Sequence, residues 1–497
     1  MVATTQTIAQ SIARSVAGPI LPARLSAVMG GEWNRTDGAV HDVLDPASET
    51  VISRFVEAPV ALVDEAVVDA HAAWTAGWRD LEPARRGRIL LAVAAALREH
   101  ADVLARLESL DCGKPLSQAR TDVEVSARYF EYYAGAVDKV GGETIPQPGG
   151  TFAYTVHEPY GVIAHVTPWN APISQMMRGV APSLAAGNTV VVKPSELTPI
   201  TSLLAAVIMV EAGLPAGVCN VVPGTGPLTG EALVSHELVR HVTFTGSVRT
   251  GRHVGRIAAD RLVGCNLELG GKSPTIILAD ADLDRAARAG ALAVIRNSGQ
   301  SCFATTRLIV DRRVEQQLLD RMAVHFAGLT VGPGLEDPDV GPLISEDQRQ
   351  KVLGHVDSAR AEGARVVVGG AACADLPKGH FVQPTLLAGV TNEMTVAREE
   401  IFGPVQSVIA FDDLEEAITI ANDTPYGLSA GVFTSDVGAA HRVAARLDAG
   451  QVQVNRYTGA GVEVPFGGYK GSGLGREKGL EALRHYTQVK SVIVAVD

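Results

Sequence analysis

The chain has 497 residues, of which 46% are hydrophobic and 20% are charged, and it carries a formal net charge of −12. A chain of this length is too long for one compact core, so we expect two or three domains. The composition is that of an ordinary globular protein, and the negative charge argues against nucleic acid or an anionic membrane as the main partner. No apolar stretch approaches the roughly 18 residues that a membrane span needs.

The N-terminal segment up to Arg24 contains no acidic side chain and places Ile8, Ile12 and Val16 at helical spacing. This pattern has a superficial similarity to a transit peptide. Because Arg14 and Arg24 are the only basic residues in it, we favour a leader helix in a cytosolic protein.

The cysteines are odd in number, lie far apart and form no CxxC pair. Such usage favours a reducing, cytoplasmic compartment and argues against a disulfide framework and a structural zinc site, so we expect no metal. The cysteines are Cys112, Cys219, Cys265, Cys302 and Cys373.

The part of the chain that follows the leader is predicted to be mainly helical. Apolar residues recur at helical spacing from Val63 to Leu110, with a break at Leu81 to Pro83, and again from Val123 to Val137. The next segment, Thr151 to Gly161, alternates in the manner of a strand and predicts a β-hairpin arm.

Strands and helices then take turns, which predicts a parallel, doubly wound sheet. We expect strands at Gly161–Thr167, Thr189–Lys193, Val218–Val222 and Val239–Thr245, and helices at Met176–Ala186 and Ser202–Ala212.

The alternation begins again after Gly271 and predicts a second α/β domain. We expect strands at Ser273–Leu278, Arg307–Val310 and Val405–Phe411, and helices at Asp282–Asn297, Arg313–Ala327, Ser345–Glu362 and Leu414–Asn422. The tail from Gln488 to Val496 predicts an edge strand, which needs a partner that another subunit could supply.

Two segments in the second half of the chain contain candidate catalytic residues. Glu268 stands in Leu267-Glu268-Leu269-Gly270-Gly271, and Cys302 closes Gly299-Gln300-Ser301-Cys302 just beyond a predicted helix. A thiol and a carboxylate are the groups needed to form a covalent adduct and release it with water. Each segment alone has an ordinary explanation, since a single cysteine is often a small buried apolar residue and Gly-Gly is often a plain turn.

Together with other ordered motifs, these segments give the chain a resemblance to the NAD(P)-dependent aldehyde dehydrogenase superfamily, from about Ile20 to the C-terminus. Several motifs in the family's order are much stronger evidence than one pattern. The motifs are Thr167-Pro168-Trp169-Asn170, Lys193-Pro194-Ser195-Glu196, Phe244-Thr245-Gly246-Ser247, the Glu268 and Cys302 segments, Glu400-Ile401-Phe402-Gly403-Pro404 and Pro465-Phe466-Gly467-Gly468.

The resemblance implies two doubly wound parallel-sheet domains and a small β oligomerisation arm, hence a homodimer or homotetramer. The dinucleotide-binding domain would comprise residues 1–138 and 161–269, and the catalytic domain residues 270–481. Residues 139–160 and 482–497 would form the arm and its tail strand.

The resemblance also implies roles for three catalytic residues. Cys302 would attack the aldehyde as a thiolate, and Asn170, together with the backbone N–H of Cys302, would stabilise the oxyanion. Hydride would leave for the nicotinamide, and Glu268 would activate the water that hydrolyses the resulting thioester to a free acid.

The expected cofactor is NAD, although the usual dinucleotide fingerprint is absent. The glycines of Phe244 to Gly251 are five apart, but a glycine turn that enters a helix still presents N–H groups to a pyrophosphate. Glu196 would accept from the ribose 2′-OH and repel a 2′-phosphate, which favours NAD over NADP. The expected cofactor residues are Thr167, Pro168, Trp169, Lys193, Ser195, Glu196, Gly226, Gly246, Ser247, Leu269, Glu400 and Phe402.

The substrate pocket shows fewer aromatic residues than expected for aliphatic or bulky apolar aldehydes, and two arginines. One interpretation is a semialdehyde or another polar aldehyde that Arg178 or Arg456 grips. The other is an aromatic aldehyde, with both arginines facing solvent or paired with Glu463 or Glu477. Gly179 replaces a lysine common in the family, so any proton relay runs differently. The expected pocket residues are Gln175, Arg178, Ser301, Phe303, Arg456, Tyr457, Ala460 and Phe466.

Two other functions are compatible with the same fold. In a coenzyme A-acylating member a thiol would take the acyl group in place of water, but such members generally lack the base that Glu268 would supply. A structural protein that has lost catalysis is disfavoured, because Cys302, Glu268, Asn170 and Lys193 are all present.

Overall fold

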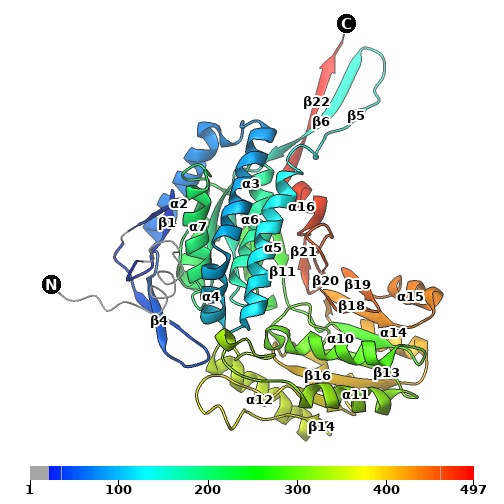
Figure 1. Ribbon diagram of the computed structural model, residues 1–497. Coiled ribbons are helices and arrows are strands. Elements are labelled where there is room, and N and C mark those ends of the chain that lie inside the picture. Colours follow the sequence, from blue (N-terminus) through cyan, green and yellow to red (C-terminus); the bar gives the residue numbers. More distant parts are fainter. Residues whose placement is uncertain (1–21, 35, 459, 497) are drawn as a thin grey trace, which may run out of the picture.

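The computed structural model describes residues 22–34, 36–458 and 460–496. Two lobes, each built around a β-sheet, lie one above the other, and a narrow β arm projects from the upper lobe (Figure 1). Two doubly wound α/β domains with an arm were predicted, and this fold is confirmed. The predicted leader helix around Ile8, Ile12 and Val16 lies outside the described residues.

The sheet of the upper lobe has the strand order β2-β1-β9-β8-β7-β10-β11-β21, and its centre from β9 to β11 is parallel. Every residue of β8 is buried because side chains alternate between two cores: Val190 and Val192 enter one core and Val191 enters the other. The strands are β1 (Val28–Met29), β2 (Glu32–Trp33), β7 (Val162–Val166), β8 (Thr189–Lys193), β9 (Cys219–Val221), β10 (Val239–Thr245), β11 (Gly264–Glu268) and β21 (Gly473–Leu474).

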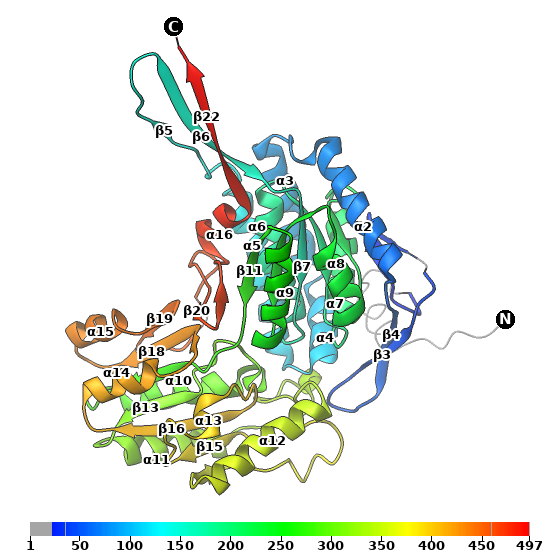
Figure 2. The ribbon, with the colours of Figure 1, turned by 180° about the vertical axis from the view of Figure 1, so that it is seen from behind.

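Helices cover both faces of this sheet. One face carries a helical layer that is seen in front in Figure 1, and the other carries a layer seen from behind in Figure 2. The first layer is α3 (Pro83–Glu99), α4 (Ala101–Cys112), α5 (Leu116–Ala134), α6 (Pro172–Ala185) and α7 (Ile200–Glu211), and the second is α2 (Val60–Ala73), α8 (Glu231–Ser235) and α9 (Val248–Asp260).

The sheet of the lower lobe has the order β14-β15-β16-β13-β12-β18-β19. The sequence did not predict β14, β15, β18 or β19. β15 and β18 are wholly buried and so lack the alternation of a half-exposed strand, and β14 and β19 are only four residues long. The strands are β12 (Pro274–Ile277), β13 (Arg307–Asp311), β14 (Arg365–Val368), β15 (Thr385–Ala388), β16 (Val405–Phe411), β18 (Ser429–Phe433) and β19 (Gln451–Val454).

Helices also pack on both faces of the lower sheet, in separate apolar cores. The first face carries α10 (Leu283–Ile295) and α11 (Glu315–Ala327), and the second carries α12 (Glu346–Ala361), α13 (Thr395–Arg398), α14 (Leu414–Asn422) and α15 (Val437–Ala444). Small sheets pair β3 (Val40–Leu44) with β4 (Val51–Val56) and β17 (Tyr426–Gly427) with β20 (Tyr469–Lys470).

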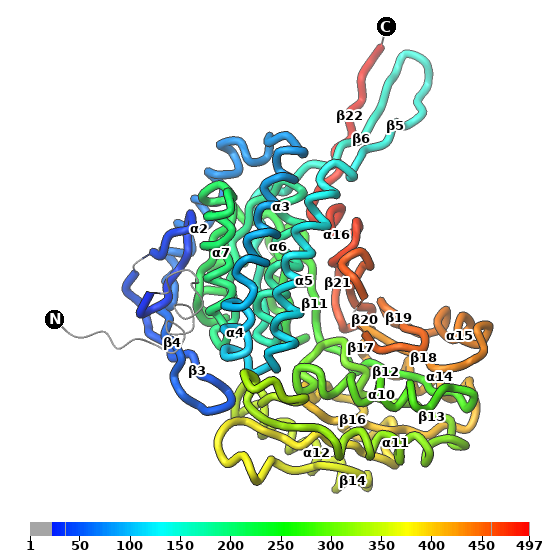
Figure 3. Tube along the Cα trace, viewed as in Figure 1, coloured from blue at the N-terminus to red at the C-terminus, as the bar shows by residue number. Residues whose placement is uncertain are grey.

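The arm has the strand predicted from the alternation at Thr151 to Gly161. Thr151–Pro159 is one strand, β6, which pairs antiparallel with β5 (Thr144–Ile145). The tail strand β22 (Thr487–Ala495) pairs with β6 of the same chain along its whole length, so its partner does not have to come from another subunit. Figure 3 shows these two distant segments running side by side.

The chain passes between the lobes at the Glu268 segment. β11 ends at Glu268 in the upper sheet and β12 begins at Pro274 in the lower sheet, so residues 269–273 connect the two. The later strand β21 returns to the upper sheet and pairs with Glu268 through Gly473. The predicted domain boundaries remain predictions. Within the described ranges, no helix is long and apolar enough to cross a bilayer.

Candidate active site

Cys302 follows a strained turn at the end of α10. Asn297 and Ser298 have positive φ angles of 49° and 55°, which residues with a side chain rarely adopt. Gly299 also has a positive φ, and a Cβ at this position would collide with the backbone of Gly403. These constraints hold the loop of the nucleophile against the segment that follows Glu400.

Asn170 is tied to the same loop from the end of β7. Its Nδ2 donates to the carbonyl of Gln300 at 2.9 Å, and Asn297 Nδ2 donates to the carbonyl of Asn170 at 2.7 Å. An amide nitrogen carries two hydrogens, so one remains to donate to a developing oxyanion. The oxyanion donor predicted from sequence therefore lies beside the nucleophile.

Two cavities share the residues Asn170, Gln175 and Cys302. One has a volume of about 350 Å³ and is bounded partly by α5 and α6, and the other has a volume of about 220 Å³ and reaches Glu268 and Glu400. Cys302 is thus reached from two sides, so two different ligands could approach its thiol.

Glu268 lies at the end of β11 and is 1% exposed. Neither carboxylate oxygen has a hydrogen-bond partner among the described residues. Burial raises the pKa of Glu268 well above its usual value, Glu477 raises it further, and Arg178 and Arg476 lower it. A raised pKa makes the ionised carboxylate a stronger proton acceptor, which is the property that a general base needs.

Cys302 itself is in a low-dielectric site. Burial raises the pKa of its thiol to about 12, Glu268 and Glu400 raise it, and Arg178 lowers it. The thiol alone is therefore a weak nucleophile, and a positive charge nearby favours the thiolate.

The smaller cavity brings together residues that the sequence predicted to contact the nicotinamide. Glu400 Oε1 accepts the backbone N–H of Gly271 at 3.0 Å, and Phe402 meets the indole of Trp169 edge-on with a centroid distance of 5.2 Å. A Cβ at Gly270 would collide with Oε2 of Glu400, so a larger residue there would displace the Glu400 carboxylate. Of the expected cofactor residues, Pro168, Trp169, Gly246, Ser247, Leu269, Glu400 and Phe402 line this cavity.

The Glu400 segment is held by a residue that sequence reasoning missed. Gln348 Nε2 donates to the carbonyls of Ile401 and Phe402 at 2.9 and 2.8 Å. No motif marks Gln348, because its contact depends on how α12 packs against the segment 400–404.

The remaining expected cofactor residues lie along the C-terminal edge of the upper sheet. Lys193 ends β8, and its Nζ pairs with Glu196 Oε2 at 3.1 Å. Burial lowers the pKa of Lys193, and Glu196 counters this shift. Ser247 caps α9 and accepts the N–H of Thr250 at 3.3 Å. Thr167, Ser195 and Gly226 likewise follow β7, β8 and β9, where an extended dinucleotide can lie across the strand ends.

The larger cavity corrects the sequence-based picture of the substrate pocket. Six of the expected residues line it, namely Gln175, Arg178, Ser301, Phe303, Ala460 and Phe466. Arg456 and Tyr457 do not line it. Arg456 is exposed and donates from Nε to Thr458 Oγ1 at 2.8 Å, whereas Tyr457 stacks behind Phe303 at a centroid distance of 5.8 Å.

The pocket is also more aromatic than its sequence segments suggested. Phe466 meets Phe303 edge-on at 6.2 Å, and Tyr129 of α5 adds a third ring to the lining. Lys114, Asp122, Arg296 and Lys478 add charges that sequence reasoning missed. Lys114, Asp122 and Lys478 come from segments far from Cys302 in sequence, whereas Arg296 stands six residues before it at the end of α10.

Arg178 does not present a free guanidinium to this cavity. It forms an ion pair with Glu477, one of the partners considered from the sequence, and it is 7% exposed. Its carbon Cζ lies 5.3 Å from the centre of the Phe466 ring. The expected grip of Arg178 or Arg456 on a remote substrate oxygen is therefore not supported by their positions.

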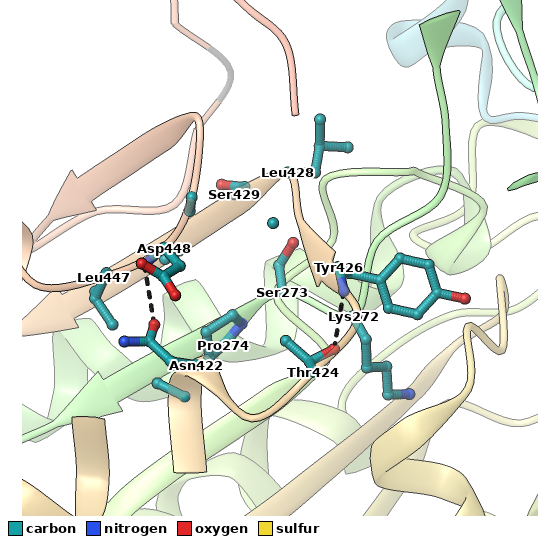
Figure 4. Close-up of a pocket in the computed structure, with 14 residues that line it drawn as sticks. Lys272, Ser273, Pro274, Asn422, Thr424, Tyr426, Leu428, Ser429, Leu447 and Asp448 are labelled. Carbon is teal, nitrogen blue, oxygen red and sulfur yellow. Dashed lines mark hydrogen bonds between the residues drawn. The ribbon is translucent and has the colours of Figure 1, made fainter. Parts of the chain in front are cut away.

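A third, small cavity of about 10 Å³ lies in the lower lobe, behind the segment 269–273 (Figure 4). Lys272 lines one side of this cavity, and Asn422 and Asp448 line the opposite side. The amine of Lys272 points away from these two residues. Burial lowers the pKa of Lys272 to about 7, and Arg307 lowers it further. This cavity is large enough only for a water molecule.

The described residues contain no group of three His, Cys, Asp or Glu side chains that could hold a metal ion.

Comparisons with known proteins agree with this geometry. The sequence model of the aldehyde dehydrogenase family matches residues 33–492. A betaine aldehyde dehydrogenase of Cereibacter sphaeroides is 44% identical, with 96% of this chain and 98% of that protein covered. The NAD+ complex of an aldehyde dehydrogenase from Bacillus cereus superposes with a TM-score of 0.93 at 40% identity, covering 95% of this chain and 97% of that one.

A third relative is the indole-3-acetaldehyde dehydrogenase of P. syringae, whose structure in complex with NAD+ has a TM-score of 0.94 and 37% identity, covering 98% of this chain and 100% of that one. Both the family match and the identities extend over nearly the whole chain. The chain therefore belongs to the aldehyde dehydrogenase family and is an aldehyde dehydrogenase whose cofactor is NAD.

Proposed function

We propose that this enzyme oxidises its aldehyde to the free carboxylic acid by covalent catalysis on Cys302. The observation that carries the proposal is the meeting of Cys302, Asn170 and Glu268 where two cavities join. The Cys302 thiolate adds to the carbonyl carbon and forms a thiohemiacetal. Asn170 Nδ2 and the backbone N–H of Cys302 donate to the oxyanion, and losing one such donor typically costs about 3 kcal/mol.

When bound, NAD supplies the two-electron oxidation that turns the thiohemiacetal into a thioester. Trp169, Glu400 and Phe402 would hold its nicotinamide end, and Lys193 and Glu196 its adenosine ribose. Glu268 then takes a proton from water, the resulting hydroxide attacks the thioester, and the acid leaves as the Cys302 thiolate is restored.

We propose an aromatic aldehyde as the substrate class. Phe303, Phe466 and Tyr129 supply flat apolar walls, and a cavity of about 350 Å³ suits a ligand of moderate size. The P. syringae relative is named for an indole aldehyde, which fits such walls. The Cereibacter relative is named for betaine aldehyde, a cation. Arg296 and Lys478 line this cavity, and their positive charges oppose a cationic substrate.

A semialdehyde remains the second candidate, for a different reason from the one given by the sequence. Lys478 lines the cavity, and its Nζ donates to the carbonyl of Ala460 at 2.7 Å. No carboxylate of the described residues lies within ion-pair distance of this amine, and Lys478 could meet the far oxygen of a carboxylated aldehyde.

We also propose that NAD is preferred over NADP, that the enzyme is a homodimer or homotetramer, and that it is cytoplasmic. Glu196, which pairs with Lys193, supports the first of these. The arm supports the second, since β22 has one unpaired edge and Ile493 is 73% exposed. The cysteines support the third, because all are free.

The test is a panel of aliphatic, aromatic, cationic and carboxylated aldehydes, assayed for NADH with NAD and with NADP and for the product acid. Free acid in amounts equal to NADH, with the highest kcat/KM on aromatic aldehydes, would support the proposal. Acid formation that requires added coenzyme A, with an acyl thioester as product, would favour the acylating alternative. Absence of NADH with every aldehyde would overturn the proposal.

A further inference from the structure

Arg178 occupies a position between the base and a second carboxylate. Its guanidinium forms an ion pair with Glu477, and its Nη2 donates to Thr245 Oγ1 at 3.4 Å. Thr245 pairs with Glu268 across β10 and β11. The three side chains of Arg178, Glu477 and Glu268 are buried, with 7%, 2% and 1% exposure.

The charged and titratable groups around Glu268 come from several elements. Glu477 lies beyond β21, Arg178 lies on α6, and Arg476 precedes Glu477. Cys302 faces Glu268 from the nucleophile loop, and Lys478 lies beside Arg178. In this group Glu268 and Glu477 repel each other, and Arg178 is the buried cation that pairs directly with Glu477.

An arginine suits this position for a chemical reason. A guanidinium does not give up its proton at any physiological pH, so it can supply a fixed charge but cannot pass a proton on. Burial opposes the charge of Arg178, but Glu477 and then Glu268 raise its pKa above the usual value. The cation therefore persists throughout the catalytic cycle.

Residue 179 cannot supply this charge instead. A Cβ at Gly179 would approach the His165 ring to 2.7 Å at Nδ1, and that ring is fixed by a 3.0 Å bond between His165 Nε2 and Ser183 Oγ. The positive charge next to Glu477 comes from position 178, at the wall of the substrate cavity.

We propose that Arg178 is a positioning residue that acts on the base through Glu477: its guanidinium neutralises Glu477, so that Glu268 stands beside a neutral ion pair rather than a bare carboxylate. Without Arg178, a buried anion would face the base and make its ionisation harder. Without Glu477, the guanidinium of Arg178 would have no carboxylate partner, and its positive charge would lower the pKa of Glu268. The two partners therefore act on Glu268 in opposite directions.

The test compares Arg178→Gln, Glu477→Gln and the double variant in single-turnover experiments. Deacylation requires ionised Glu268, so its rate rises with pH through the apparent pKa of that residue. We expect Arg178→Gln to move this pKa upward by about 1–3 units, Glu477→Gln to move it downward, and the double variant to return it close to wild type. Arg178→Lys, which keeps a cation, should lie between wild type and Arg178→Gln.

Arg98→Gln is the matched control, because Arg98 forms an ion pair with Glu124 in the same lobe but at the exposed surface. Its profile should match wild type. Shifts of equal sign in the two single variants, or a double variant as impaired as Arg178→Gln, would overturn the proposal. A raised KM for carboxylated aldehydes alone, with an unchanged pH profile, would make Arg178 a substrate-binding residue instead.

This inference rests on the proposed function of Glu268, and a measurement without aldehyde separates the two. Iodoacetamide alkylates the thiolate of Cys302, and mass spectrometry of the peptide that contains Cys302 gives the rate. This rate depends on the positive charge of Arg178, because that charge favours the thiolate. Arg178 lowers the pKa of the Cys302 thiol, so Arg178→Gln should slow alkylation at fixed pH about 10-fold, and the double variant should not recover the rate. An unchanged alkylation rate would overturn the role of Arg178, whether or not wild type oxidises any aldehyde.

Discussion

Asn297 connects the two halves of the candidate active site, since its Nδ2 donates to the carbonyl of Asn170 at 2.7 Å and its own N–H donates to Gln118 Oε1 at 2.8 Å. The side-chain bond of Asn297 thereby holds Asn170 against the loop of Cys302. Its positive φ of 49° shows that this turn adopts a strained conformation.

Replacing Asn297 should reduce catalysis more than stability. Asn297→Gly accepts the positive φ but loses the bond to Asn170, so we expect kcat to fall about 10- to 100-fold through misplacement of the nucleophile loop. Asn297→Ala should lose the same bond and also strain the turn, which would lower the midpoint of urea unfolding. Equal activity of Asn297→Gly and wild type would contradict this role.

Cys302→Ala should abolish NADH formation, because the covalent step requires the thiolate. Cys265→Ala is the control, since Cys265 is half-buried on β11 and lines neither cavity at Cys302. Steady-state NADH assays distinguish the two variants. More than trace turnover by Cys302→Ala would exclude it as nucleophile.

Glu268→Gln should keep the oxidative step and slow hydrolysis of the thioester. Rapid mixing with a good substrate should then show a burst of NADH equal to the number of sites, followed by a slow steady state. If fast turnover persisted without a burst, another group would have to be the base.

Glu196→Ser should narrow the preference for NAD. The change removes a carboxylate that would repel a 2′-phosphate. We expect the free-energy preference for NAD, calculated from the ratio of kcat/KM for NAD over NADP, to fall by about 1–3 kcal/mol. Glu211→Ser, at the end of α7, is a charge-matched control that should leave the ratio unchanged. A wild-type preference for NADP would contradict the assignment of Glu196.

Lys478 should make the binding of a carboxylated aldehyde depend on pH. Burial and Arg178 lower the pKa of its amine to about 8, so its positive charge is present below that pH and is lost as the pH rises through it. KM for a carboxylated aldehyde should rise across this range, while KM for a neutral aromatic aldehyde should not. Lys478→Met should remove the difference, and a pH-dependent KM that survives this change would contradict the role of Lys478.

Several helices and strands could be predicted from the sequence because they depend on local periodicity, whereas the order of the strands in each sheet could not. β8, β10, β16 and α14 have the predicted bounds. The Glu268 and Cys302 segments were chosen for their residue types, and their roles were implied by the resemblance of the ordered motifs to a known family. The strands β15 and β18 were missed, because a fully buried strand has no polar face to mark it, and β14 and β19 were missed because each has only four residues.

The residues of the candidate site also fall into two groups, those that the sequence predicted and those that only the structure revealed. Residues within ordered motifs, such as Cys302, Asn170 and Glu400, were predicted because close neighbours in sequence mark them. Lys114, Tyr129, Gln348 and Lys478 were not, since they reach the cavities by packing of helices and loops from distant parts of the chain. The role of Arg178 also depended on the tertiary structure. An arginine in a sequence can bind a substrate, face solvent or pair with a carboxylate, and only the position of Glu477 against α6 decides among these, because ion pairing requires contact in space.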